Sequence, residues 1–70
     1  MLVAVGIAVR ELRTAKAMSQ EELALRAGLD RTYVGNVERG QSNVALLTLA
    51  RIAKGLDTTL IQLLAKVSLD

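Results

Sequence analysis

Residues 19–40 read SQEELALRAGLDRTYVGNVERG, and this stretch decides the fold. Ser19 and Glu22 have the spacing of a capping box, in which the serine oxygen accepts a hydrogen bond from the backbone three residues on and the glutamate reaches back. The box predicts a helix over residues 20–27. Gly28 follows that helix directly, where a residue with positive φ usually ends a helix.

A second short helix is expected over residues 31–39. Asp30 can cap its start through the side-chain oxygen, and Gly40 closes its end. Val34 and Val37 give this helix an inner, apolar face. Two short helices joined by a tight turn form a helix-turn-helix, and the second helix of such a unit can lie in the major groove of DNA.

The composition limits the chain to one small domain, which we take to span residues 1–70. About half of the residues (51%) are apolar, yet Tyr33 is the only aromatic residue and proline is absent. A core without Phe or Trp must be built from Leu, Val, Ile and Ala, so the expected fold class is all-α. The chain has no Cys and no His, the side chains that most often bind metals or transfer protons. We therefore expect no enzyme and no metal site, and in 70 residues we expect room for neither a cofactor nor a domain that senses a small-molecule ligand.

Three further helices are predicted outside the opening stretch. The helical spacing of apolar residues places them at residues 3–16, 46–54 and 60–66. Thr59 and Gln62 repeat the capping-box spacing and mark the start of the last helix. The expected inner face of the helix at 46–54 carries Leu46, Leu49, Ile52 and Ala53.

The first nine residues, MLVAVGIAV, could be mistaken for the apolar part of a secretory signal. No basic segment precedes them, and Arg10 and Glu11 follow at once. The run is also too short to span a bilayer. We read it as the start of a core helix and expect a cytoplasmic protein that makes no membrane contact.

The run at residues 19–40, preceded by VRELRTAK and followed by LARIAKGL, resembles the helix-turn-helix domain of lambdoid-phage repressor and Cro proteins. Within that family, RTYVGNVERG followed by NVALLTL looks most like the small controller proteins of restriction–modification systems. The resemblance covers roughly residues 5–64. It implies a five-helix, λ-repressor-like domain that regulates transcription as a homodimer on a pseudo-palindromic operator in double-stranded DNA.

The resemblance also implies roles for single residues. The positions that face base edges are Arg31, Thr32 and Asn36. The positions at the sugar-phosphate backbone are Gln20, Tyr33, Arg39, Ser42 and Asn43. Glu38 matches an acidic residue that forms an ion pair with a basic residue on the first helix, here Arg13. The residue types fit these roles, because an arginine fork can donate to guanine O6 and N7 together, and an asparagine can pair with adenine or bond a phosphate.

The sequence departs from the family pattern at several positions. Ala17 stands where a glycine is usual, which predicts a strained or altered turn. Gly35 lies inside the recognition helix, and Ala45 replaces a capping serine. Apolar residues stand where the family often has charges at Leu25, Leu47 and Ile61.

The last helix carries more apolar residues than one inner face needs. Because a palindromic operator needs two symmetry-related recognition helices, we expect the surplus to serve a homodimer. The predicted interface consists of Leu47, Leu60, Ile61 and Leu64.

Other readings remain open from the sequence alone. The polar residues of helix 31–39 could be solvated surface, and Tyr33 could be partly packed instead of bound to a phosphate. Gly35 could be tolerated, or it could allow DNA or a partner to approach closely. At the level of the whole protein, the alternatives are an antitoxin-type regulator that binds a toxin and a protein-interaction module that does not bind DNA.

Overall fold

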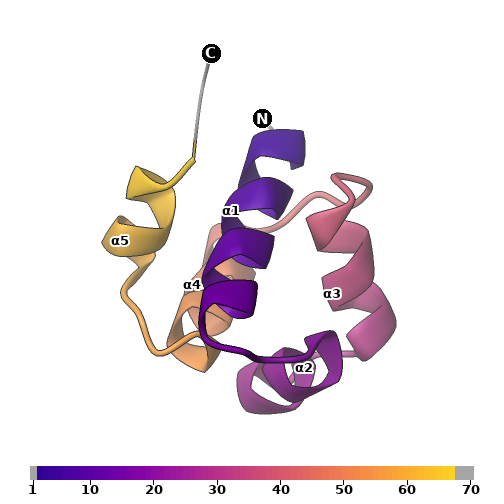
Figure 1. Cartoon of the computed structure of the whole chain (residues 1–70). Coiled ribbons are helices and arrows are strands. Elements are labelled where there is room, and N and C mark those ends of the chain that lie inside the picture. Colours follow the sequence, from indigo (N-terminus) through magenta and orange to yellow (C-terminus); the bar gives the residue numbers. More distant parts are fainter. Residues whose placement is uncertain (1, 68–70) are drawn as a thin grey trace.

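Five helices follow one another along residues 2–67, the part of the chain that the computed structural model describes, and that part contains no strand. Their bounds are α1 Leu2–Ala15, α2 Gln20–Ala27, α3 Arg31–Glu38, α4 Leu46–Gly55 and α5 Leu60–Ala65 (Figure 1). The expected all-α class is confirmed. The predicted ends differ from these bounds by one residue at most places: Lys16 lies beyond α1, and Arg39 and Lys66 follow α3 and α5 as C-caps.

α2 and α3 each begin with a side-chain hydrogen bond to a backbone N–H two or three residues further along the chain. The Ser19 hydroxyl accepts from the Glu22 N–H at 3.0 Å, and the Asp30 carboxylate accepts from the Thr32 N–H at 2.9 Å. The second half of the expected Ser19–Glu22 box does not form. The Glu22 carboxylate instead accepts from Arg26 at 2.7 Å, one turn along α2, so that half of the prediction is wrong.

The box at α5 is complete. The Thr59 hydroxyl accepts from the Gln62 N–H at 3.1 Å, and the Gln62 side-chain oxygen accepts from the Thr59 N–H at 3.3 Å. α4 differs, because Ala45 at its N-cap supplies no side-chain hydrogen bond. Local spacing therefore explains where α5 begins, whereas α4 depends on packing for its start.

The turns that end α1 and α2 adopt left-handed backbone conformations. Gly28 has φ 69° at the C-cap of α2, as the sequence predicts. Ala17 has φ 53° after α1, which is the strained turn expected where the family pattern has glycine.

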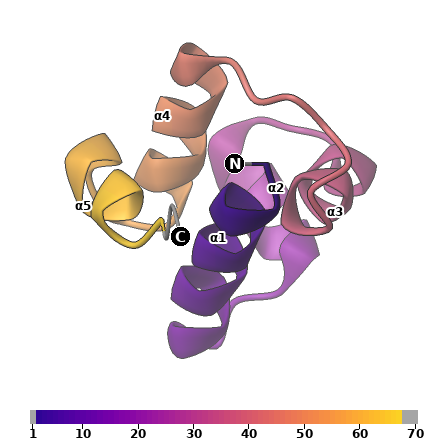
Figure 2. The ribbon, with the colours of Figure 1, turned by 90° about the horizontal axis from the view of Figure 1, so that it is seen from above.

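The core lies where α1 passes between α3 and α5, with α2 and α4 completing the bundle (Figures 1 and 2). Its largest fully buried side chains come from every helix or its end: Val9, Leu23, Val34, Val37, Ile52, Leu56 and Leu63. α1 and α3 approach closely at Gly6, since a Cβ there would lie 2.6 Å from the Glu38 carbonyl oxygen and nearer still to that of Val37. Glycine is therefore required on α1 at this crossing.

Leu46 corrects the predicted inner face of α4. Its side chain is 65% exposed, whereas Leu49, Ile52 and Ala53 are buried as expected. The first turn of α4 lies at the edge of the core, and only the later turns pack against other helices.

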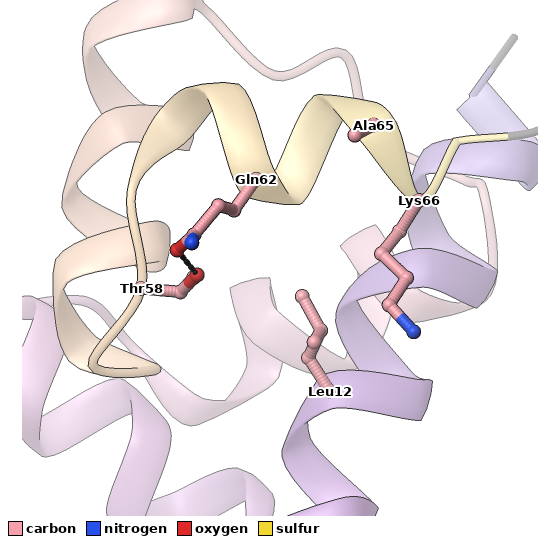
Figure 3. A pocket seen from close by; sticks show the side chains of 5 residues that line it. All are labelled: Leu12, Thr58, Gln62, Ala65 and Lys66. Carbon is pink, nitrogen blue, oxygen red and sulfur yellow. Dashed lines mark hydrogen bonds between the residues drawn. The ribbon is translucent and has the colours of Figure 1, made fainter.

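A pocket opens between α1 and α5 (Figure 3). Leu12 of α1 faces it from one side, and Gln62, Ala65 and Lys66 line it from the other. At its edge the Thr58 hydroxyl donates to the Gln62 side-chain oxygen at 2.7 Å. α5 therefore contacts α1 along only part of its length.

Candidate nucleic-acid interface

The first turn of α3 is exposed to solvent because the helix packs on the core through its opposite side. Val34 and Val37 are buried in the core, which turns the opposite side of the helix outward. Arg31 and Thr32 are exposed at its start, and Asn36 is half-buried one turn after Thr32. The three residues expected to read bases thus lie on α3 away from its buried stripe.

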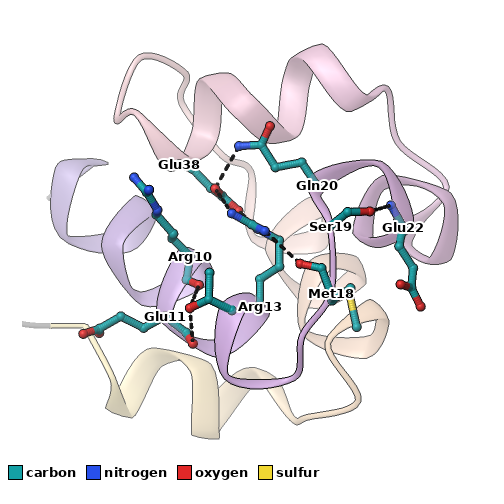
Figure 4. Close-up of polar contacts among 9 residues, drawn as sticks. Arg10, Glu11, Arg13, Met18, Ser19, Gln20, Glu22 and Glu38 are labelled. Carbon is teal, nitrogen blue, oxygen red and sulfur yellow. Dashed lines mark hydrogen bonds and ion pairs between the residues drawn. The ribbon is translucent and has the colours of Figure 1, made fainter.

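A buried acid at the end of α3 ties three helices together (Figure 4). The Glu38 side chain is only 3% exposed and accepts from Arg13 Nε at 2.6 Å and Arg13 Nη2 at 3.0 Å. Gln20 Nε2 donates to the same carboxylate at 2.9 Å. Arg13 Nη1 also donates to the Met18 carbonyl at 2.8 Å, which holds the turn after α1. This fork-to-fork geometry neutralises the carboxylate inside the protein.

The neutralised acid has an electrostatic consequence for the outer surface. α3 and its caps contain two carboxylates, Asp30 and Glu38, and two exposed arginines, Arg31 and Arg39. Because Glu38 is paired with Arg13, its charge does not compete for the exposed arginines. The outer side of α3 therefore presents net positive charge, which suits a phosphate-rich partner.

Gln20 lies at the first position of α2, where the family places a phosphate contact. Its amide is oriented by Glu38, and its oxygen would lie 3.6 Å from a Cβ built on Gly35 of α3. A primary amide has two N–H donors, so one hydrogen remains after the bond to Glu38. Gln20 thus braces α2 against α3, and the phosphate contact stays a prediction.

Tyr33 is half-buried and packs against the core, which corresponds to the packed alternative in the sequence reading. Its hydroxyl donates to the Asn43 carbonyl at 3.3 Å and so links α3 to the loop that follows Gly40. Ser42 is half-buried and Asn43 is exposed in that loop. A hydroxyl has a single proton to donate. The expected Tyr33–phosphate contact, still a prediction, therefore requires the hydrogen bond from Tyr33 to the Asn43 carbonyl to break.

Arg39 folds back along α3 instead of extending away from it. Its Nη2 donates to the Asn36 side-chain oxygen at 2.5 Å, and its Nε lies 3.4 Å from the Gln41 side-chain oxygen. The resemblance assigns Asn36 to base reading and Arg39 to the sugar-phosphate backbone, and a hydrogen bond links these two side chains.

Arg51 on α4 is a contributor that the sequence reading does not single out. Its Nε donates to the Ala27 carbonyl at 3.1 Å and its Nη2 to the Gly28 carbonyl at 2.8 Å. These bonds occupy carbonyls at the end of α2, inside the turn of the helix-turn-helix. No local signal reveals this, since the partners are separated by 23 and 24 residues and a basic residue on a helix usually indicates solvated surface.

A helix-turn-helix family model matches residues 9–63 of this chain. The chain belongs to the helix-turn-helix family. Control protein C.SmaI of Serratia marcescens is 48% identical over 61 residues, which cover 87% of this chain and 73% of that protein. The sequence-based resemblance to this family and to its controller proteins is confirmed.

Two solved structures show the same likeness in three dimensions. The restriction–modification controller protein C.AhdI from Aeromonas hydrophila superposes with a TM-score of 0.86 at 55% identity, covering 89% of this chain and 94% of that one. The controller protein C.Esp1396I, solved as a tetramer in complex with its natural 35 base-pair operator, gives a TM-score of 0.84 at 33% identity. That match covers 93% of this chain and 91% of the other.

The residues predicted to form a dimer interface differ in exposure. Leu47 is 81% exposed, Ile61 80% and Leu64 42%. Leu60 is half-buried and packs against the core, so it contributes less free apolar surface than the other three. α4 and α5, which carry these residues, lie side by side (Figure 2). Within residues 2–67, each helix is too short or too polar to traverse a lipid bilayer.

Proposed function

We propose that this chain is a sequence-specific DNA-binding regulator of transcription that controls the genes of a restriction–modification system. The observation that carries the proposal is the likeness to C.AhdI, at 55% identity over 89% of the chain. The chemistry of α3 supports it, because Arg31 and Arg39 are exposed while the charge of Glu38 is neutralised by Arg13.

The proposed mechanism separates positioning from reading. α3 enters the major groove, where Arg31 donates its planar fork to a guanine and Thr32 and Asn36 contact neighbouring bases. Contacts to phosphates fix the register of α3 in the groove, and they come from Gln20, Tyr33, Arg39, Ser42 and Asn43. The neutral Arg13–Glu38 pair holds α3 at a constant angle to α1 during this docking.

The working unit in this proposal is a homodimer on a pseudo-palindromic operator. Ile61 and Leu64 of α5, with Leu47 and the outer part of Leu60, are buried between the two copies. A twofold axis then places the two α3 helices about 34 Å apart, which matches half-sites one DNA turn apart. Occupancy of the operator depends on protein concentration through the dimer equilibrium. Such a regulator acts on DNA in the cytoplasm and carries out no catalysis.

Selection of bound sites from random duplex DNA, combined with sedimentation of the free protein, tests this function. We expect enrichment of a motif with twofold symmetry and half-site centres about 10 base pairs apart. Uniform, sequence-independent binding would contradict specific regulation. A protein that is monomeric at micromolar concentration and binds a single half-site tightly would contradict the dimer, while leaving DNA recognition intact.

A further inference from the structure

The Arg39 side chain occupies a hollow on α3 that exists because residue 35 is glycine. A Cβ built on Gly35 would lie 3.2 Å from Arg39 Nη1 and 3.6 Å from Nη2. The first distance is tighter than most Cβ contacts and the second is ordinary van der Waals contact, so the guanidinium packs directly on α3 at Gly35 and an alanine there would displace it by a few tenths of an ångström. Glycine inside a helix is less favourable than alanine. Gly35 therefore provides space for the Arg39 guanidinium. The sequence analysis considered only that this glycine is tolerated or that it lets DNA or a partner approach.

From this position Arg39 fixes the orientation of the Asn36 amide. Nη2 of Arg39 lies 2.5 Å from Oδ1 of Asn36. A guanidinium has only donors, so the asparagine atom that faces it must be the oxygen. The Nδ2 amino group of Asn36 is then the end of the amide that remains for other partners.

The contact changes what Asn36 can recognise. An unrestrained asparagine reads adenine with both ends of its amide, donating to N7 and accepting from the N6 amino group. Here one lone pair of Oδ1 is occupied, and a positive charge stands beside the other. An adenine N6 amino group approaching that oxygen would meet the N–H groups of Arg39, which are also donors. Guanine offers acceptors at both O6 and N7, so donors on the protein meet acceptors on the base.

Resting on the proposed function, we propose that Arg39 is a positioning residue that makes Asn36 select guanine over adenine, with Gly35 providing the space. Arg39 then determines sequence preference through Asn36. This differs from the phosphate contact expected for Arg39, which would strengthen binding to every sequence about equally.

The test is site selection from random duplex DNA with wild type and matched variants. Asn36→Ala first identifies the base pair that Asn36 contacts, as the position at which preference disappears. At that pair, wild type is expected to prefer guanine over adenine by about fivefold or more. Arg39→Ala keeps the asparagine donor but removes the neighbouring charge, so the guanine preference falls and adenine gains.

Two further variants separate the donor from the charge beside it. Asn36→Asp still accepts from Arg39 but has no N–H, so the guanine preference is lost although the contact remains. Gly35→Ala moves the guanidinium and weakens the same preference without touching either polar group. Arg26→Ala, an exposed arginine on α2, is the control and leaves the motif unchanged.

The results are read at that one base pair, with thermal melts to verify folding of each variant. Selection of adenine by wild type there would overturn the inference. So would an Arg39→Ala variant that loses affinity equally on all sequences and retains guanine. Both outcomes leave specific DNA binding standing, whereas failure of wild type to enrich any motif would contradict the proposed function itself.

Discussion

α3 and α5 are both short helices, yet the protein holds them in different ways. α3 buries Val34 and Val37, and Glu38 at its end bonds side chains from α1 and α2. α5 has Leu63 as its one buried residue, and the polar contacts of its Gln62 reach only Thr58 and Thr59, at most four residues earlier in the sequence. α3 is thus fastened by long-range polar contacts, whereas α5 packs on the core through Leu63 and the half-buried Leu60, and its own polar contacts are local.

The different anchoring of α3 and α5 suits different tasks, base reading for α3 and dimer assembly for α5. A helix that reads bases must keep its angle to the rest of the domain, and the buried network around Glu38 provides that rigidity. A helix that joins two copies needs apolar surface left over after folding, which the 80% exposure of Ile61 provides. The two helices therefore predict different responses to substitution.

Breaking the anchor of α3 should have the largest effect on stability. Glu38→Gln leaves the Arg13 guanidinium buried without a counter-charge, and we expect a loss of about 3–5 kcal/mol in the free energy of unfolding. Chemical denaturation measures this. Glu22→Gln is the matched control, since its pair with Arg26 is half exposed and should change stability by less than about 0.5 kcal/mol. A Glu38→Gln melt that overlays wild type would mean that the network does not anchor α3.

Breaking the surface of α5 should leave the fold intact and remove the dimer. Ile61→Asp places a charge where burial between copies would contribute about 1.5–3 kcal/mol per side chain. We expect a folded monomer by sedimentation, with much weaker binding to the full operator. Leu25→Asp on α2 changes an equally exposed leucine and should alter neither property. Dimers that persist in Ile61→Asp would remove α5 from the interface.

On the reading surface, Arg31→Ala should cost binding but not stability. Loss of a guanidinium fork on guanine is expected to weaken the selected site by about 1–3 kcal/mol and to relax preference at one base pair. Asn43→Ala should instead weaken all sequences about equally. Competition binding on operators mutated one position at a time distinguishes the two, and an unchanged motif for Arg31→Ala would contradict direct reading by that side chain.

The smallest effect is expected at the turn between α2 and α3. Arg51→Ala removes two hydrogen bonds to the Ala27 and Gly28 carbonyls, so we expect a stability loss of about 1 kcal/mol. Because this turn sets the angle of α3, operator affinity should fall as well. Lys54→Ala, an exposed cation on the same helix, is the control for the loss of charge. Equal behaviour of the two variants in both denaturation and binding would show that Arg51 is only surface.

The sequence by itself determined the features whose partners lie within a few residues. Asp30, Gly28 and the Thr59–Gln62 box act over at most four residues, so spacing alone located the starts of α3 and α5 and the end of α2. Helical periodicity identified most of the core for the same reason. The roles assigned to single DNA-contacting residues came from the family resemblance instead, and they await the experiments above.

Apart from the Arg13–Glu38 pair, which the family resemblance implied, only the tertiary structure decided contacts between residues far apart in the chain. The Arg51 bonds to the helix-turn-helix, the close approach at Gly6 and the exposure of Leu46 depend on how whole helices cross. At the start of α2, the expected box with Ser19 is incomplete because Glu22 pairs with Arg26 one turn along the same helix, a local contact that the capping-box pattern does not include. A linear pattern states which residue types recur, but contacts such as those of Arg51 and Gly6 depend on distances that exist only after the helices have packed.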